Sequence, residues 1–438
     1  MDAEVIIIGA GLSGLTCALR LQQAGVRTLL LEAADRPGGR IASDRRDGFL
    51  LDRGFQVLQT WYPGARRALD YEALDLRPFY PGALVHLDGG VHRVSDIWRR
   101  PHRLPEMLVS PIGSLADKLR LLGLRQRALR GRLRDLYERP ETTALELLRA
   151  RGFSPRIIER FFKPFFAGVF FEPELTVSSR TFEFIFRAFA LGDTALPARG
   201  MEEIPRQLAG RLVPDSIRFG HRVVRVLHAM AILDGGERLR ARAIVIATDG
   251  GETDRLLGLE PGPSRGTTCF YFAAPEAPYA GAYLSLDGSG SGPVNSLLCP
   301  SNLSPHYAPP HEALVTVNCF GTGRDPDALE PEVRDQLRGW YGEVVDSWRR
   351  IAVYRLPAAL PVQAPPVPAP AGTRRLQDWL WVCGERAAPP SIHWALTSGR
   401  RTAEAVLEAF HAAAHPAGDE AAAPNKPPAG TGTRRQRR

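Results

Sequence analysis

The chain has 438 residues, of which 44% are hydrophobic and 24% charged, a composition that is typical of globular proteins and excludes the fibrous and disordered classes. This length predicts two or three domains or one large two-lobed enzyme. The formal net charge is +8, and no apolar run reaches the roughly 18 residues that a membrane-spanning helix needs.

The first predicted unit covers residues 4–32 and reads as a strand, a glycine turn, a helix and a second strand. Residues 5–8 form a continuous apolar run, as in a strand buried on both faces, so the unit is the start of a parallel βαβ fold. Because this strand begins almost at once, there is no room before it for a secretory leader, and we expect a cytoplasmic protein.

The middle of the chain predicts helices followed by strands. Residues 65–211 read mainly as helices, interrupted by a hairpin at 83–94. Residues 216–250 contain short β segments, the last of which, 243–248, is another buried strand. Residues 268–320 alternate strand-like runs with loops, which indicates an antiparallel sheet.

The last part of the chain predicts a helix at 331–347 and then a connector at 356–372 that is too rich in proline for regular structure. A strand at 379–385 and a helix at 393–410 close the folded part.

These elements predict an α/β fold with a split Rossmann-type domain, built on a parallel sheet, and a second lobe of helices and antiparallel sheet. The split domain takes residues 1–75, 205–265 and 360–412, the second lobe takes 76–204 and 266–359, and 413–438 read as a disordered tail.

Three glycines at the first strand-to-helix turn carry the clearest chemical signal. Gly9, Gly11 and Gly14 form G-x-G-x-x-G, in which the first permits the turn, the second lets the backbone approach a pyrophosphate, and the third allows close packing of helix on strand. Leu12 and Ser13 lie inside the motif, where the N–H groups of the helix N-terminus face the phosphates.

The second strand ends in an acid, Glu32, 18 residues beyond Gly14. A carboxylate at this place accepts hydrogen bonds from a ribose diol, so Glu32 and the adjacent Ala33 are predicted to bind adenosine. In the following "RPGGR", Gly38 and Gly39 allow close backbone approach and Arg40 offers a planar donor fork to phosphate oxygens. Taken alone, this stretch fits a glycine turn with a surface arginine better than a cofactor contact.

The pattern continues in "LLDRGFQVL" at 50–58 and in "WVCGERAAPPSIHWALTSGRRTAEAVL" at 381–407. With these stretches the chain resembles, over residues 3–411, the FAD-dependent amine oxidase and carotenoid desaturase superfamily, which includes protoporphyrinogen oxidase and the phytoene desaturases. The resemblance implies that the split Rossmann-type domain binds FAD and that the second lobe binds substrate.

The resemblance also implies positions for the cofactor. Arg40 would reach the phosphate-ribityl arm of the flavin, and the N-terminus of the closing helix would stabilise negative charge on reduced flavin. The other implied contacts are Gly54, Phe55, Gln56 and Val57 along the isoalloxazine ring, Val223 at the adenine, Gly384 and Glu385 near the ribityl and pyrophosphate, and Ser391 and Ile392 at the pyrimidine edge.

Two departures from the superfamily bear on the substrate. Its desaturase-like ending is commonly Ser-Ile-Glu-Gly-Ala, whereas this chain has His393 and Trp394 after Ser391 and Ile392, so we expect Trp394 to reshape the space near the ring. Amine oxidases of the superfamily share a lysine near flavin N5 and a tyrosine in the C-terminal motif. The matching tyrosine position here is Ser391, and the lysines are Lys118, Lys163 and Lys426, none of them in the predicted sheet, which disfavours amine oxidation.

The resemblance implies an FAD-dependent oxidoreductase that removes hydride from a hydrophobic small molecule, like the carotenoid or isoprenoid desaturases. A protoporphyrinogen-type oxidase is the nearest enzymatic alternative, with an amine oxidase behind it. A flavin-free module that binds prenylated proteins, like the GDP-dissociation inhibitors, is the alternative of another class. The catalytic residues are not assigned, although His393 is a candidate acid or base beside the expected flavin.

Other features leave two interpretations open. Residues 93–139 hold 12 basic and five acidic residues, a net charge of +7, which fits either a solvated face or docking on an anionic membrane. No nucleic-acid-binding motif accompanies this charge, so we expect no nucleic-acid partner.

The aromatic run at 160–172 fits core packing or a substrate tunnel. The five cysteines lack CxxC spacing, which predicts buried thiols in a reducing compartment and no metal site.

Overall fold

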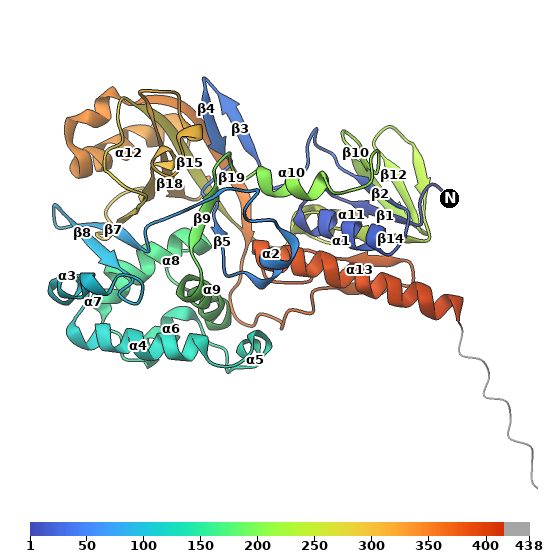
Figure 1. Cartoon of the computed structure of the whole chain (residues 1–438), viewed down its shortest axis with the longest axis horizontal. Helices are drawn as coiled ribbons and strands as arrows, with labels where there is room; N and C mark the ends of the chain where they lie inside the picture. The colour runs from blue at the N-terminus through green and yellow to red at the C-terminus, as the bar shows by residue number, and fades with distance from the viewer. Residues whose placement is uncertain (416–438) are drawn as a thin grey trace, which may run out of the picture.

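The computed structural model describes residues 1–415 and shows two lobes side by side along the long axis of the molecule (Figure 1). The lobe that contains the N-terminus is built on a six-stranded sheet in the order β10-β2-β1-β14-β21-β20. The first five strands of that order pair in parallel and β20 is antiparallel. These strands are β1 (Val5–Ile8), β2 (Thr28–Leu31), β10 (Ile217–Arg218), β14 (Ala243–Ile246), β20 (Arg374–Gln377) and β21 (Leu380–Val382).

Alternate side chains of β1 enter two different cores, as the apolar run at 5–8 predicts. Val5 and Ile7 pack in a core with helices α1 (Leu12–Gln23) and α13 (Ile392–Ala414), while Ile6 and Ile8 pack with the three-stranded sheet on the other face. That sheet consists of β11 (Val223–Leu227), β12 (Met230–Leu233) and β13 (Arg238–Arg240). Helices α1 and α13 therefore cover one face of the parallel sheet.

The other lobe contains a seven-stranded sheet in the order β19-β15-β18-β17-β16-β7-β8. Its pairs are antiparallel, as predicted, except for β16 with β7. Helix α12 (Pro326–Tyr341) packs on one face. The strands are β7 (Gly82–Leu87), β8 (Gly90–Ser95), β15 (Ser264–Ala274), β16 (Leu284–Asp287), β17 (Val294–Leu298), β18 (Ala313–Phe320) and β19 (Arg349–Pro361).

Residues 104–191 form the predicted helical part of this lobe, at the lower left in Figure 1. Glu183 is buried among these helices and pairs with both Arg127 and Arg139. Phe162, Phe166 and Phe170 are at most 5% exposed, so this part of the aromatic run packs in the core, while Phe161, Phe165 and Phe171 are half-buried. The helices are α3 (Leu104–Val109), α4 (Leu115–Leu129), α5 (Leu133–Tyr137), α6 (Ala144–Ala150), α7 (Pro155–Ile157), α8 (Lys163–Phe170) and α9 (Ser179–Leu191).

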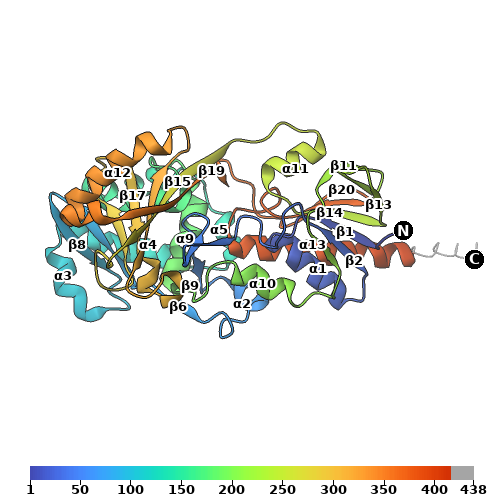
Figure 2. The same cartoon turned by 90° about the horizontal axis from the view of Figure 1, so that it is seen from above.

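Short elements lie between the two lobes, as the view from above also shows (Figure 2). Two small antiparallel sheets, β3-β4 and β5-β9-β6, were not predicted. The remaining elements are β3 (Ser43–Arg46), β4 (Phe49–Asp52), β5 (Leu58–Gln59), α2 (Pro63–Ala68), β6 (Leu76–Pro78), β9 (Thr194–Pro197), α10 (Glu203–Ala209), α11 (Gly250–Leu257), a π turn at Ile158–Phe162 and 3-10 turns at Pro101–Arg103, Pro300–Asn302, Pro305–Tyr307 and Gly342–Ser347.

Three boundaries differ from the sequence expectations. The prediction of an irregular proline-rich connector is wrong over 356–361, where strand β19 continues through Pro357. Because β19 is an edge strand of its sheet, a residue without an N–H is tolerated there. The expected helix at 331–347 is α12 followed by a 3-10 turn. The predicted tail begins too early, because α13 continues to Ala414, and residues 416–438 lie outside the described part of the chain. The two domain limits drawn from the sequence stay a prediction.

All five cysteines are buried, unpaired thiols, as predicted. Within residues 1–415 there is no helix long and apolar enough to cross a membrane.

Candidate functional site

The glycine turn after β1 shows three different reasons for glycine. Gly9 has φ +104°, and a Cβ on Gly14 would lie 1.9 Å from the carbonyl oxygen of Gly9, so α1 starts in direct contact with the turn. A Cβ on Gly11, by contrast, would meet nothing within 4 Å. The backbone at Gly11 is therefore open to a ligand above the N-terminus of α1, where free N–H groups attract anions.

Glu32 is held rigidly at the carboxyl end of β2. One carboxylate oxygen accepts the Ala10 N–H at 2.7 Å and the other accepts the Ala34 N–H at 2.8 Å. Each oxygen keeps a further lone pair, so the carboxylate can still accept from a ribose diol. The adjacent Ala33 is exposed.

The segment that leads to Val223 is bonded to the same place. His221 N–H donates to the Glu32 carbonyl at 2.8 Å and Gly220 N–H donates to the Ala34 carbonyl at 2.9 Å. Val223 itself is buried, and its carbonyl accepts from Arg255 at 3.1 Å. The structure thus places the two predicted adenosine contacts, Glu32 and Val223, on adjoining segments.

The second glycine pair lies against the first turn. Gly38 donates its N–H to the Ala10 carbonyl at 2.9 Å, and a β-bridge joins it to Gly11. Gly38 and Gly39 both have positive φ, +126° and +60°, and a Cβ on Gly39 would lie 3.6 Å from the Cα of Gly11. The "RPGGR" stretch therefore extends the open backbone surface of the glycine turn.

Arg40 connects this turn to the other end of the chain. Its guanidinium lies 2.5 Å from the Glu385 carboxylate and donates to the Ala359 carbonyl at 3.1 Å. Glu385 also accepts the N–H of Gly250. Gly384 has φ +85°, and a Cβ there would lie 3.4 Å from Ser13 Oγ, so Ser13 and the Gly-Glu pair meet at the same place.

The Gly54–Val57 stretch lies beside Arg40. Gln56 donates its side-chain amide to the carbonyls of Arg40 at 2.6 Å and Arg53 at 3.0 Å, while its Oε1 is buried without a partner. Gly54 donates its N–H to the Tyr271 hydroxyl at 2.9 Å, which ties this stretch to the seven-stranded sheet. Phe55 and Val57 pack partly buried against the core.

Comparison with known proteins agrees with this geometry. A family model described as flavin containing amine oxidoreductase matches residues 12–407. The chain belongs to this family. It is an FAD-dependent oxidoreductase, and the flavin-free binding module proposed as an alternative is set aside.

Relatives of this flavoprotein have several named activities. A lycopene-forming phytoene desaturase of Pseudescherichia vulneris is 40% identical over 85 residues, covering 18% of this chain and 17% of that protein. A phytoene dehydrogenase of Streptomyces griseus is 25% identical over 310 residues, covering 59% and 56%. A coproporphyrinogen III oxidase of Propionibacterium freudenreichii is 30% identical over 79 residues, covering 18% and 15%. The chain thus matches at most about half the length of these curated relatives.

Solved structures share the fold over nearly the whole chain. Cyclohexylamine oxidase from Brevibacterium oxydans superposes with a TM-score of 0.70 at 18% identity, covering 94% of this chain and all of that one. A putative protoporphyrinogen oxidase from Exiguobacterium superposes with a TM-score of 0.70 at 17% identity, covering 93% and 99%.

The residues of this flavoprotein fit FAD. The open backbone at Gly11 and Gly39, the carboxylate of Glu32 and the unpartnered Oε1 of Gln56 form one line of groups from β2 to the seven-stranded sheet. Arg40 can turn from the Ala359 carbonyl to phosphate oxygens while it stays beside Glu385. The individual contacts predicted from the sequence remain predictions.

The N-terminus of α13 is predicted to lie at the pyrimidine edge of the flavin. Ser391 caps the helix by accepting the Trp394 N–H on Oγ at 3.1 Å, and Ile392 is half-buried. Trp394 does not open toward a ligand: its indole N–H donates to the Tyr137 hydroxyl at 3.0 Å and its ring is 4% exposed. The bulky side chain therefore packs α13 onto α5, and the expectation that it reshapes the space near the flavin ring stays a prediction.

His393 is buried among aromatic rings of Tyr62, Phe184 and Trp394. Its Nδ1 accepts the Gly64 N–H at 3.0 Å, so the proton of the neutral ring sits on Nε2, which has no partner. Burial, together with the nearby cations of Arg401 and Arg67, lowers the pKa of His393 to about 4. The imidazole is therefore neutral at pH 7 and links α13 to α2.

A buried polar cluster around Asp52 was missed by sequence reasoning. Asp52 accepts from Ser43 Oγ, from the Met201 N–H at 2.9 Å and from the Tyr307 hydroxyl at 2.7 Å, and burial raises its pKa. Its carbonyl accepts from Tyr271. The signal was an acid within the apolar run "FLLDRG", which predicts a buried carboxyl with partners.

A small cleft lies between the Asp52 cluster, the Gly54–Gln56 stretch and buried residues of β15, β17 and β18 in the seven-stranded sheet. Its non-atom space of about 270 Å³ includes open solvent, and the enclosed part is no larger than a water molecule needs. Its apolar wall comes from Phe55, Leu196, Leu298, Pro300 and Leu314. The polar groups that remain are Gln56, Thr316 and the two tyrosines bonded to Asp52.

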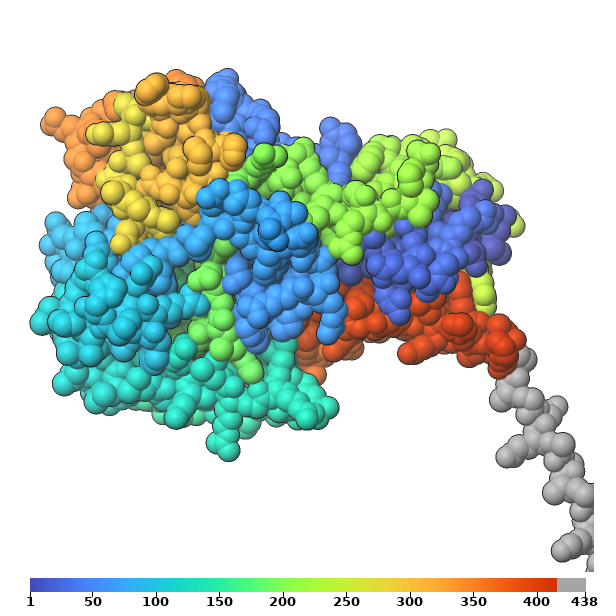
Figure 3. Space-filling model, viewed as in Figure 1, coloured from blue at the N-terminus to red at the C-terminus, as the bar shows by residue number. Residues whose placement is uncertain are grey.

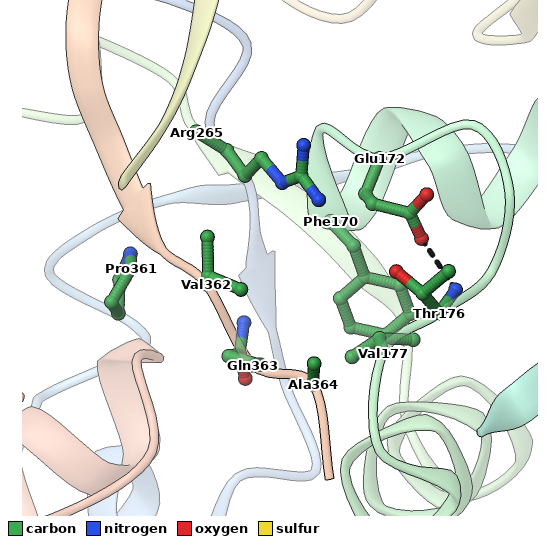
Figure 4. A pocket seen from close by; sticks show the side chains of 9 residues that line it. All are labelled: Phe170, Glu172, Thr176, Val177, Arg265, Pro361, Val362, Gln363 and Ala364. Atoms are coloured by element: carbon green, nitrogen blue, oxygen red, sulfur yellow. Dashed lines mark hydrogen bonds between the residues drawn. The ribbon is translucent and has the colours of Figure 1, made fainter. Parts of the chain in front are cut away.

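A second small cleft, whose non-atom space of about 230 Å³ includes open solvent, lies where β19 ends, between β15 and the loop after α8 (Figure 4). Its walls include Phe170, Val177 and Val362. Figure 4 shows Arg265 extending toward Glu172, whose carboxylate accepts the N–H groups of Glu174 and Thr176 at 2.7 and 2.6 Å. Among the described residues, no carboxylate lies within 4.0 Å of the Arg265 guanidinium.

The two lysines in the described chain are engaged in the helical region. Lys118 donates to the carbonyls of Leu108 and Ser110, and Lys163 pairs with Glu159 and Glu174. Neither residue lines either cleft.

Proposed function

We propose that this flavoprotein desaturates a hydrophobic, isoprenoid-like substrate in the cleft beside Gly54–Gln56. The supporting observation is that the stretch predicted to run along the flavin ring forms one wall of a cleft whose other residues are mostly apolar. An apolar wall binds hydrocarbon by excluding water and orients it by shape. The named relatives that desaturate phytoene support this choice of substrate class.

Bound FAD supplies a hydride acceptor, the substrate also loses one proton, and an oxidant such as oxygen or a quinone reoxidises the flavin. The role of the protein is to position the substrate and to shield it from water. The Asp52–Tyr271–Tyr307 cluster anchors the Gly54 stretch to the sheet, so the two walls of the cleft keep a constant separation. The N-terminus of α13, whose Trp394 N–H is capped by Ser391 Oγ, provides a partial positive charge at Ser391 and Ile392.

The absence of a lysine from the two clefts also supports oxidation of a carbon–carbon bond over oxidation of an amine. We expect anaerobic mixing of the holoenzyme with phytoene-like polyenes to bleach the flavin absorbance, and mixing with primary and secondary amines to leave it unchanged. Reduction by an amine, with no reduction by polyenes or porphyrinogens, would contradict the proposal.

Porphyrinogen oxidation is the second candidate, and Arg265 is the observation in its favour. Porphyrinogens carry carboxylate side chains, and the guanidinium of Arg265 stands in a cleft of mixed polar and apolar lining, which also contains Glu172, with no carboxylate of residues 1–415 within 4.0 Å. A charged donor of this kind binds a carboxylate more tightly than a neutral one does.

Arg265→Met separates the two candidates. If a carboxylated porphyrinogen is the substrate, we expect its KM to rise by about tenfold or more, since a hydrogen bond to a charged group contributes about 1.5–3 kcal/mol. If a neutral polyene is the substrate, its steady-state kinetics should not change. Arg238→Met, which alters an exposed arginine of β13, is the matched control for loss of one positive charge.

A further inference from the structure

The surface around helices α3 and α4 exposes an unusual number of apolar side chains. Of the 17 large hydrophobic residues that are exposed in the described chain, eight lie between residues 91 and 122. We call these the apolar patch: Val91, Trp98, Leu104, Leu108, Val109, Leu115, Leu119 and Leu122. Such a concentration marks an interaction surface, whereas single exposed apolar residues do not.

The patch is ordered by the geometry of α4. Leu115, Leu119 and Leu122 have the i, i+4, i+7 spacing that places side chains on one helix face, and they are 60%, 60% and 44% exposed. Leu124 and Ala128 on the same helix are buried against the core. Helix α4 therefore has two apolar faces, and only one of them is covered by the protein.

Lys118 holds α3 beside α4. Its ammonium donates to the carbonyls of Leu108 at 2.8 Å and Ser110 at 3.2 Å. Leu108 and Val109, which are 46% and 84% exposed, thus continue the face that the leucines of α4 begin.

The charge around the patch is positive. Residues 98–125 include six basic and two acidic residues, a net charge of +4, and one of the two acids, Asp117, is fully buried. Arg125 lies over the ring of Trp98 at 4.6 Å and Arg100 lies over the ring of Tyr80 at 5.5 Å. Within residues 1–415 neither arginine has a carboxylate within 4.0 Å. Both guanidinium groups are therefore available to pair with an anionic partner.

We propose that the apolar patch docks on an anionic lipid surface, with the leucines entering the interface and Arg100 and Arg125 at the headgroups. Apolar side chains bordered by arginine, with an exposed tryptophan, are the composition that such an interface favours. A second copy of the chain would bring the same positive charge against itself, which disfavours self-association through this face.

The orientation that results keeps the nucleotide-binding lobe away from the lipid. Helices α3 and α4 lie at the end of the molecule remote from β1 and β2 (Figure 1). The space-filling view shows residues of this segment forming the outer left face (Figure 3). This inference concerns a surface outside both clefts and does not depend on which substrate is oxidised.

The test is co-sedimentation of the FAD-loaded protein with vesicles of pure phosphatidylcholine and with vesicles that contain one-quarter phosphatidylserine. We expect binding to the serine-containing vesicles that weakens as salt is raised. The double variant Leu115→Asp and Leu119→Asp should lose at least tenfold in partitioning, and Arg100→Gln with Arg125→Gln should lose the preference for anionic lipid.

The matched control is Val213→Asp with Leu259→Asp, because these side chains are 60% and 58% exposed outside the patch. Flavin content and melting temperature verify that each variant is folded. Failure of the wild-type protein to bind anionic vesicles, or equal binding by the patch and control variants, would overturn the proposal. A dimer that Leu115→Asp with Leu119→Asp converts to monomer would also overturn it, in favour of a second copy on this face.

Discussion

Gly11→Leu is expected to yield a folded, colourless protein. A Cβ added at Gly11 would meet nothing within 4 Å in the protein, and the residue has φ −71°, which any amino acid adopts. The variant is therefore expected to fold, because its side chain starts in open space. The side chain instead occupies the space over the N-terminus of α1, where the cofactor's pyrophosphate is predicted to lie.

Flavin absorbance per chain after purification, and calorimetric titration with FAD, measure this loss. Gly323→Leu is the matched control, because a Cβ there also meets nothing within 4 Å and the residue lies in a loop of the other lobe. The melting temperature without added FAD should be similar for both variants. A yellow Gly11→Leu protein with full flavin content would show that the cofactor does not pass over this turn.

Replacing His393 by asparagine is expected to flatten the dependence of stability on pH. The pKa of His393 is lowered to about 4 in the folded protein, against an ordinary value near 6.5. Between these values the unfolded chain binds the proton and the folded protein does not, so the free energy of unfolding falls as pH falls. For one such group the loss from pH 7 to pH 4 is about 3 kcal/mol.

Asparagine can still accept the Gly64 N–H but does not titrate, so His393→Asn should lose about 3 kcal/mol less than wild type over this range. Urea unfolding at pH 7, 5.5 and 4 measures the difference. His86 is the matched control, because burial lowers its pKa to about 4 as well. It stacks on Trp340 and does not belong to the contacts between α13 and α2. His86→Asn should flatten the profile separately, and the two effects should add. An unchanged slope in His393→Asn would contradict the lowered pKa of the buried imidazole.

The elements that sequence predicted well depend on contacts between near neighbours. Gly9, Gly11, Gly14 and Glu32 belong to one strand–turn–helix–strand unit, whose geometry is determined by local backbone sterics and by the period of the apolar residues. The alternation of β1 between two cores follows from the same run. Those residues alone predicted a nucleotide-binding lobe, and with the C-terminal motif they indicated the family that the comparison confirms.

Long-range partners explain where sequence prediction was wrong. Six residues of the proline-rich connector form a strand because β15 provides hydrogen-bonding groups along one side of β19. Trp394 packs on Tyr137, which lies 257 residues away, so its place could not be derived from the spacing of the C-terminal motif. Asp52 finds Tyr307 and Met201 only in the folded chain.

By itself, then, the sequence determined the strand–turn–helix–strand unit with its glycine turn and the acid at the end of β2, and it predicted that this unit binds a dinucleotide, because those groups belong to one local unit. Only the tertiary structure decided that Arg40 meets Glu385, that Gly54–Gln56 forms a cleft with the seven-stranded sheet, and that one face of α4 stays uncovered. These features depend on which distant segments pack together, and side-chain packing, unlike the period of a strand or helix, is not encoded in any short stretch of residues.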